Sequence, residues 1–171
     1  DEANYEAVVY EGFGPSGTAM IVEALTDNKN RTISNMRSIF EKNGYSLGTE
    51  GSVSYQFEIC GLIKIKKDSC SEAEIFEQST NFGAEDFKVE GDFYEIYTKK
   101  NNLHEIQSEL EKKYQLNFCG IIYNPKSSIK VEKQDFEKII SFIDALEDDD
   151  DVQKVYSNFE VDEKILTEMS S

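Results

Sequence analysis

The sequence predicts an α+β protein built from two α/β-sandwich domains, one inserted into the other. Residues 61–123 show strand and helix patterns in the order βαββαβ, which is the ferredoxin-like split arrangement. The helix and strand patterns after residue 125 are too few to bury an apolar face alone, so they are expected to join the elements before residue 58. We therefore predict a discontinuous ββαβ–αβ domain over residues 1–58 and 125–171, and an inserted ferredoxin-like domain over residues 59–124.

The discontinuous domain is expected to begin with two apolar strands and a helix. The helix is predicted because apolar residues recur at helical spacing after Asn30, and because Gly44 is suited to a left-handed C-terminal stop. The tail after Asp162 is polar and is expected to fray. The expected elements are strands Tyr5–Glu11, Gly17–Thr26 and Val53–Phe57, a helix over Asn30–Asn43, a second helix over Lys133–Glu147, and a strand over Val152–Phe159.

The inserted domain is expected to hold four strands and two helices. Ser71 and Glu74 have the spacing of a capping box, and Gly83 follows the last apolar position of that helix. Gly91-Asp92 is a hairpin turn between two short strands. The expected strands are Leu62–Lys66, Phe87–Glu90, Phe93–Thr98 and Asn117–Tyr123, with a second helix carrying Leu103, Ile106, Leu110 and Tyr114 on one stripe.

A glycine-rich turn separates the first two strands, and a second glycine pair precedes the third. These glycines are expected to shape the loops: Gly12, Gly14, Gly17, Gly48 and Gly51. The first turn is not a P-loop, because no Lys-Ser or Lys-Thr pair follows it and it leads into a strand. A tight hairpin is favoured over direct ligand contact there.

Charge is distributed unevenly. The formal net charge of −16 argues against nucleic acid wrapping the whole surface. All four cations of residues 1–57 nevertheless fall within or beside the first predicted helix, whose N-terminus favours anions. A local cationic face for binding is therefore predicted. The equal alternative is that these charges only keep an exposed helix face soluble. The predicted nucleic-acid contacts are Asn28, Lys29, Asn30, Arg31, Arg37 and Lys42.

The sequence offers no defensible active site, and no cofactor or metal is expected. The three cysteines lack CxxC spacing, so reduced thiols are expected instead of disulfides or zinc. His104 could pair with Cys60 or Cys119, but nothing in the sequence would orient it. The acidic run at residues 147–151 could chelate a divalent cation, yet it lacks the spacing of an EF-hand loop and is read as a solvated turn.

Three motifs in order carry a family resemblance. The motifs that carry the resemblance are YEGFGPSG with ALTDNKNRT, then SLGTEGSVSYQF, and finally IDALEDDDDVQKVYSNFE. With them, the chain resembles the YebC family from about residue 4 to residue 160. That family includes bacterial transcriptional regulators of the YebC/PmpR type and a mitochondrial translational activator of cytochrome c oxidase. The resemblance implies three domains, of which the chain matches the second and third and lacks the N-terminal helical one.

By this resemblance the intact protein would be a non-enzymatic regulator of gene expression. Its expected partners are DNA or ribosomal RNA on the ribosome, with binding expected to need the N-terminal domain. The expected location is the cytoplasm, with an organelle matrix as the alternative. No small-molecule substrate is evident, and no run of residues is apolar enough to predict a membrane span. The competing hypothesis is a protein-interaction or ligand-sensing module without nucleic-acid contact.

Overall fold

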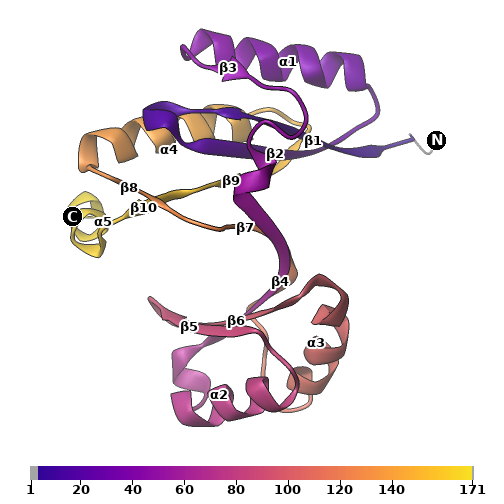
Figure 1. Ribbon diagram of the computed structural model, residues 1–171, viewed down its shortest axis with the longest axis vertical. Helices are drawn as coiled ribbons and strands as arrows, with labels where there is room; N and C mark the ends of the chain where they lie inside the picture. The colour runs from indigo at the N-terminus through magenta and orange to yellow at the C-terminus, as the bar shows by residue number, and fades with distance from the viewer. Residues whose placement is uncertain (1–3, 171) are drawn as a thin grey trace. The chain divides into compact units, whose positions relative to one another are not determined.

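The computed structural model describes residues 4–170 and confirms the mixed α+β class, with two separate antiparallel sheets and five helices in that range (Figure 1). The chain divides into two compact units, one comprising Asp1–Glu58 with Pro125–Ser171 and the other Ile59–Asn124. We call them unit 1 and unit 2. Both boundaries fall within strands, β4 (Phe57–Lys66) and β7 (Phe118–Pro125), because each strand continues from one unit into the next.

Unit 1 is built on a four-stranded sheet in the order β3-β1-β2-β9, joined by a small parallel pair, β10 and β8. Strands β1 and β2 form a long antiparallel hairpin, in which Tyr10 lies opposite Val22 and Phe13 opposite Ala19. The elements of this unit are β1 (Glu6–Phe13), η1 (Pro15–Gly17), β2 (Ala19–Thr26), α1 (Lys29–Lys42), β3 (Ser46–Leu47), η2 (Ser54–Gln56), β8 (Ile129–Val131), α4 (Lys133–Glu147), β9 (Val152–Ser157), β10 (Phe159–Val161) and α5 (Glu163–Ser170).

One face of the sheet in unit 1 is covered by α1 and α4. Alternate residues of β2, Met20 and Val22, point to this face and are fully buried. They meet an apolar stripe from each helix, which supplies the large side chains of the core. The buried helical residues of that cluster are Met36, Phe40, Phe136, Ile139, Phe142 and Leu146.

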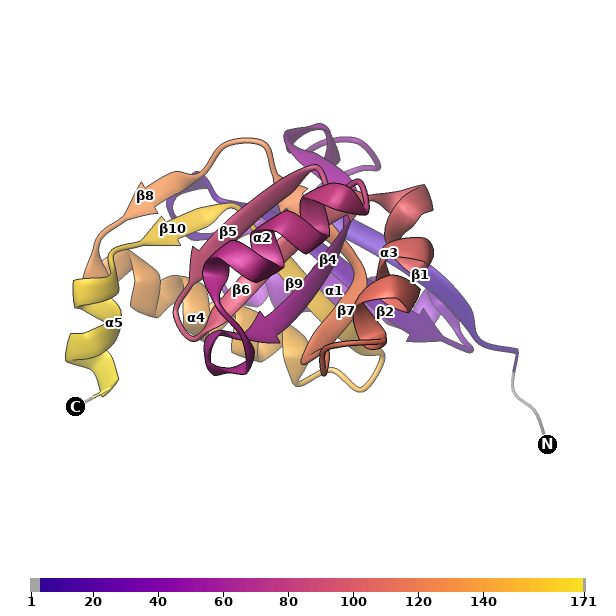
Figure 2. The ribbon, with the colours of Figure 1, turned by 90° about the horizontal axis from the view of Figure 1, so that it is seen from below.

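Unit 2 contains a four-stranded antiparallel sheet in the order β5-β6-β4-β7, which is the strand order of a ferredoxin-like fold. Helices α2 and α3 lie side by side across one face of this sheet (Figure 2). Its remaining elements are η3 (Lys67–Ser69), α2 (Glu72–Asn81), β5 (Asp86–Glu90), β6 (Phe93–Lys99), η4 (Lys100–Asn102) and α3 (Leu103–Glu111). The core between sheet and helices contains Ile63, Ile65, Ile75, Ile96, Ile106 and Leu110, all fully or almost fully buried.

Local signals in the sequence explain how two of the helices begin or end. Gly44 adopts a φ of +86° directly after α1, so the predicted left-handed stop is confirmed. The hydroxyl oxygen of Ser71 accepts the N–H of Glu74 at 3.2 Å, which is the predicted cap of α2.

Three expectations about local structure are wrong. Residues 54–56 form a 3₁₀ turn instead of an alternating strand, and the strand begins at Phe57. The last strand divides into β9 and β10 at the buried Asn158. The segment after Asp162 forms helix α5, and its Ile165 packs against the core of unit 1, so apolar contact orders a segment that composition alone marked as a tail.

Candidate nucleic-acid interface

The first turn of α1 is held by polar side chains from its own motif. Asn28 is the N-cap, and its Oδ1 accepts the backbone N–H of Arg31 at 3.1 Å. The N–H of Asn28 in turn donates to Oγ1 of Thr26 at 2.9 Å. Because the first N–H groups of a helix have no partner within the helix, these contacts satisfy donors that would otherwise need water. Asn28 therefore has a structural role at the site where nucleic-acid contact was predicted.

Arg31 is bound to two carboxylates of the protein. Its Nη2 donates to Asp151 Oδ1 at 2.9 Å and its Nε to Asp151 Oδ2 at 3.3 Å, so the pair is bidentate. The same Nη2 lies 3.0 Å from Oδ1 of Asp27. The guanidinium is thus matched by negative charge within the fold, and its side chain remains 44% exposed.

Asp151 is the centre of this network. Oγ1 of Thr32 lies 2.8 Å from Oδ2 of Asp151 and 2.7 Å from Oγ1 of Thr26, so two hydroxyls and the carboxylate form one chain of hydrogen bonds. Burial of Asp151 raises the pKa of its carboxyl, but hydrogen bonds from Thr32 and Arg31 outweigh that effect and hold the pKa below its ordinary value. Asp151 is therefore a firmly ionised partner for α1.

The acidic run at residues 147–151 lies against one polar side of α1. Nδ2 of Asn35 donates to Oδ2 of Asp149 at 3.2 Å, one turn along the helix from the Arg31 contact. Asp149 also accepts the N–H of Asp151 through its other oxygen at 2.9 Å. The run was interpreted as a solvated turn, and this is wrong for Asp149 and Asp151, although Asp150 is exposed. No local pattern predicts this contact, because Asn35 and Asp149 are 114 residues apart.

The other predicted contact residues lie in different surroundings. Nζ of Lys29 pairs with Glu6 of β1 at 2.7 Å, and this hydrogen bond raises the pKa of the lysine. Asn30, Arg37 and Lys42 are exposed along α1, and within residues 4–170 neither Arg37 nor Lys42 forms an ion pair. The six residues therefore do not form one continuous free surface: Asn28 and Arg31 are engaged in the fold. Their contact with nucleic acid stays a prediction.

A buried glutamate organises the loop that precedes β4. Glu11 is only 5% exposed, and its Oε1 accepts the backbone N–H groups of Val53 and Ser54 at 2.8 Å each. Burial raises the pKa of this carboxyl, but hydrogen bonds from the backbone of Gly51, Val53 and Ser54 outweigh it and lower the pKa overall. The carboxylate thus replaces the water that these loop amides would otherwise bind.

The loop-shaping glycines occupy the same region of unit 1. A Cβ on Gly12 would lie 2.7 Å from the carbonyl oxygen of Ser46 and 2.9 Å from the ring of Phe40, so only glycine lets β1 approach β3 this closely. Gly48 donates its N–H to the carbonyl of Glu11 at 2.8 Å. Of the remaining three, Gly14 abuts Met20, and Gly17 and Gly51 have φ values of +74° and +89°.

Asn158 is a structural residue that sequence reasoning missed. It is 2% exposed, its Oδ1 accepts the N–H of Ala19 at 2.9 Å, and its Nδ2 donates to Oε1 of Gln56 at 3.1 Å. Its carbonyl also accepts the N–H of Ile129 at 2.7 Å. The strand pattern offered no distinguishing signal, because Gln153, Lys154 and Ser157 of the same segment are polar as well.

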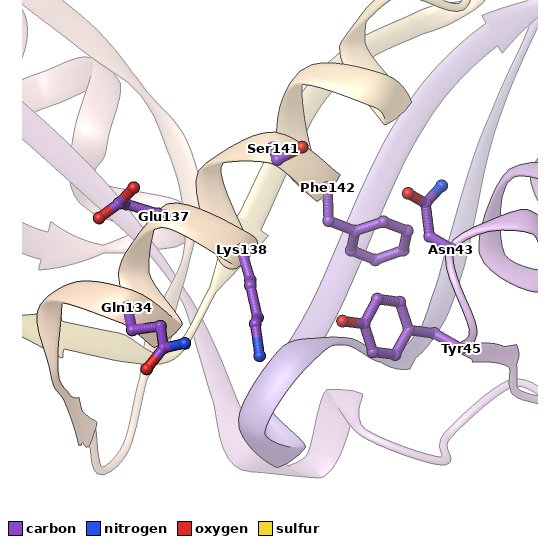
Figure 3. Close-up of a pocket in the computed structure, with 7 residues that line it drawn as sticks. All are labelled: Asn43, Tyr45, Gln134, Glu137, Lys138, Ser141 and Phe142. Carbon is purple, nitrogen blue, oxygen red and sulfur yellow. The ribbon is translucent and has the colours of Figure 1, made fainter.

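An open hollow lies between the end of α1 and the first turns of α4 (Figure 3). The rings of Tyr45 and Phe142 meet there with centroids 4.9 Å apart, and Lys138 projects beside them (Figure 3). The lining is completed by Asn43, Gln134, Glu137 and Ser141. These lining residues do not include two side chains arranged as a general acid and a general base.

The groups considered for catalysis are not assembled into a site. His104 is exposed on α3, and burial together with Glu111 raises the pKa of Cys119 instead of activating its thiol. Cys70 and Cys119 are free cysteines. Within the described part of the chain, no three His, Cys, Asp or Glu side chains are grouped to hold a metal ion. No helix within residues 4–170 has the length and apolar character of a membrane span.

The geometry defines a class of two-unit α+β proteins, in which a ferredoxin-like unit interrupts a sheet unit whose first helix is anchored by an acidic loop. The chain belongs to the TACO1/YebC family: residues 5–159 match the family model described as "TACO1/YebC second and third domain". It is 45% identical over 164 residues to a "Probable transcriptional regulatory protein" of Thermoanaerobacter pseudethanolicus, covering 95% of this chain and 67% of the relative.

Two further comparisons agree with this assignment. The "Probable transcriptional regulatory protein YrbC" of Bacillus subtilis is 42% identical over 161 residues, which covers 93% of this chain and 67% of that protein. The crystal structure of a conserved hypothetical protein, Aq1575, from Aquifex aeolicus superposes with a TM-score of 0.87 at 39% identity, covering 97% of this chain and 69% of that one. The names of the Thermoanaerobacter and Bacillus relatives describe transcriptional regulation. The chain spans about two thirds of the length of these relatives.

Proposed function

We propose that this chain is part of a non-enzymatic, YebC-type regulator of gene expression that binds nucleic acid through the exposed cations of α1. The observation that carries the proposal is membership of a family whose relatives are named probable transcriptional regulatory proteins. The nucleic acid is DNA in a transcriptional role or ribosomal RNA in a translational one, and both present the same polyanionic backbone. The proposed location is the cytoplasm, or the matrix of an organelle.

The proposed contacts are the cations of α1 that the fold leaves accessible. Arg37 and Lys42 are exposed and have no carboxylate partner among the described residues, and Lys29 holds Glu6 only through an ion pair in which both side chains are more than half exposed. An exposed pair of this kind contributes little to stability, so a phosphate can replace the carboxylate at small cost. Arg31 serves instead to position the helix, through Asp151.

The acidic body limits how nucleic acid approaches. The chain carries a net charge of −16, and Asp149 and Asp151 lie beside the first turns of α1. Electrostatic attraction therefore acts only close to Arg37 and Lys42, within a Debye length of roughly 8 Å at physiological salt. Binding of this kind is expected to be local, weak in the isolated chain and strongly dependent on salt.

The test is charge reversal on α1 with a matched control elsewhere. The double variant Arg37→Glu/Lys42→Glu is compared with Lys112→Glu, which changes an exposed lysine directly after the end of α3. Dissociation constants for duplex DNA and for fragments of ribosomal RNA are measured against salt concentration. We expect the double variant to weaken binding and to reduce the log–log salt slope by about one to two, while the control changes neither. Unchanged affinity and slope in the double variant would discard the proposal.

The alternative is a protein-interaction or ligand-sensing module. The observation that favours it is an apolar patch on the sheet of unit 1, where Val9 and Leu25 are 44% and 42% exposed on the side away from α1 and α4. An apolar partner would bind there with little salt dependence. The salt series described above therefore separates the two candidates.

A further inference from the structure

The sheet of unit 2 has one face that neither α2 nor α3 covers. Its side chains are known from the strand register, because neighbours in a strand point to opposite faces. Ile63, Ile65 and Ile96 point to the helices and are fully buried. Lys64 of β4 and Lys88 of β5 are on the other face, and each lies opposite Glu95 of β6.

Two aromatic side chains of the central strand β6 lie on this open face. Phe93 and Tyr97 are four residues apart on β6, so both point away from the helices, and both are half-buried. A lysine lies over each ring: Nζ of Lys64 is 5.9 Å from the centroid of Phe93, and Nζ of Lys88 is 5.1 Å from the centroid of Tyr97. Each ring therefore has a cation in contact with it, and an amine displaced from the ring by a stacked base would lie close to the phosphate of that nucleotide.

In unit 2 the helices carry acidic residues, whereas lysines lie on the strands. Helices α2 and α3 contain no lysine or arginine, and they carry the acidic residues Glu72, Glu74, Glu77, Glu105, Glu109 and Glu111. The lysines within its strands all point to the open face of the sheet: Lys64, Lys66, Lys88 and Lys99. The helical side therefore repels a polyanion, whereas the sheet offers it cations between the acidic groups of the strands.

We propose that the open face of the sheet β5-β6-β4-β7 binds a short segment of single-stranded RNA, with bases stacked on Phe93 and Tyr97 and phosphates held by Lys64, Lys66 and Lys88. The inference rests on the proposed function, since it assigns a second nucleic-acid surface to the same regulator. Four-stranded sheets with aromatic residues on a central strand use this mode of recognition. Strand β6 is central in this sheet, between β5 and β4.

Glu95 favours RNA over DNA at this surface. Its Oε1 accepts the hydroxyl of Tyr97 at 2.8 Å, and its Oε2 lies 3.5 Å from Nζ of Lys64. Each carboxylate oxygen has a further lone pair, which can accept a ribose 2′-hydroxyl. DNA lacks that donor and cannot form this additional hydrogen bond with Glu95.

The test uses the 171-residue chain and a fluorescein-labelled single-stranded RNA of eight nucleotides with mixed sequence, followed by fluorescence anisotropy. We expect Tyr97→Leu and Phe93→Leu each to weaken binding about tenfold, because leucine keeps the apolar volume but cannot stack. Phe76→Leu is the matched control, since Phe76 is 52% exposed on α2, on the helical side. Lys64→Gln with Lys88→Gln should lower the salt slope by about one to two, and Lys112→Gln should not.

The outcomes distinguish this inference from the proposed function. If the α1 double variant abolishes binding of the RNA octamer while Phe93→Leu and Tyr97→Leu leave it unchanged, the sheet surface is wrong and the α1 surface stands. If RNA affinity falls only in the Phe93→Leu and Tyr97→Leu variants, the sheet surface stands and the α1 surface is wrong. Equal affinity for DNA of the same sequence would overturn the role of Glu95. Circular dichroism of each variant verifies that the fold is retained.

Discussion

Asp151 and Arg31 are 120 residues apart in the sequence and form a bidentate ion pair at the start of α1. The contact fastens the loop between α4 and β9 to the helix that carries the proposed nucleic-acid surface. Two of the predicted recognition residues, Asn28 and Arg31, thereby fix the position of α1. Arg37 and Lys42 then present their charges from a helix whose first turn cannot shift freely.

Removing Asp151 should loosen this junction. Asp151→Ala leaves Thr32 Oγ1 and the guanidinium of Arg31 without their shared acceptor, and we expect the free energy of unfolding to fall by about 1–2 kcal/mol. Urea denaturation followed by circular dichroism measures the change. Asp150→Ala is the matched control, because that neighbour is exposed and should change stability little. Equal effects of the two substitutions would contradict the anchoring role.

Glu11 should make stability depend on pH in the acid range. Its pKa in the folded protein lies below the ordinary value of 4.5, so the unfolded state binds its proton first. The stabilisation from its carboxylate is fully present above pH 4.5 and is lost as the pH falls through the lower folded pKa. Glu11→Gln should therefore reduce stability near neutral pH by about 1–3 kcal/mol and flatten the acid dependence.

Urea unfolding at several pH values between 7 and about 3 tests this expectation. Glu50→Gln is the control, since Glu50 is exposed in the same loop. An unchanged acid dependence in Glu11→Gln would show that the loop amides do not depend on this carboxylate.

Gly12 should not tolerate a methyl group. The Cβ of Gly12→Ala would press on the backbone of Ser46 and the buried ring of Phe40, and neither can move without disturbing β3 or the core. We expect a loss of about 1–3 kcal/mol in unfolding free energy, measured by chemical denaturation. Gly44→Asn provides the contrast: its φ of +86° suits asparagine, and no atom lies within 4 Å of the added Cβ. A near-neutral Gly12→Ala would mean that β1 and β3 can separate.

Phe142 should be the costliest single truncation in unit 1. It is 1% exposed, and its ring contacts Phe40 with centroids 5.0 Å apart and Tyr45 at 4.9 Å. Phe142→Ala is expected to reduce the free energy of unfolding by about 3–5 kcal/mol, because the cavity is surrounded by packed rings. The half-exposed Phe76, truncated in the same way, should cost about 1 kcal/mol or less. Thermal and urea unfolding of both variants give the comparison.

The sequence was informative wherever structure is determined locally. Helical spacing of apolar residues placed α1 and α4, and glycine marked the end of α1, because these signals act over one or two turns. The short parallel pair β8 and β10 was missed, since three-residue strands show too little alternation to be recognised. Asn158 was missed for a different reason, because its partners Ala19 and Gln56 lie far away in the sequence.

The candidate site was predicted less well than the fold, for a physical reason. The composition of residues 28–31 signals polar contact, but it does not show whether the partner is a phosphate or a carboxylate elsewhere in the chain. Asp151 supplies such a carboxylate to Arg31, and Glu6 supplies one to Lys29. A cation near a helix N-terminus thus indicates that a negative group is nearby, without saying which molecule provides it.

The pairing of β4 with β7 bears on how unit 2 could be removed by design and how it could have been inserted during evolution. The two strands are neighbours in one sheet, and each contains a boundary of unit 2, so the chain departs from and returns to unit 1 through adjacent strands. A short peptide bridge from Glu58 to Pro125 is therefore the natural design for a version reduced to the flanking halves. Because the two connections are adjacent, a domain could be inserted at this position during evolution without disrupting the fold of unit 1.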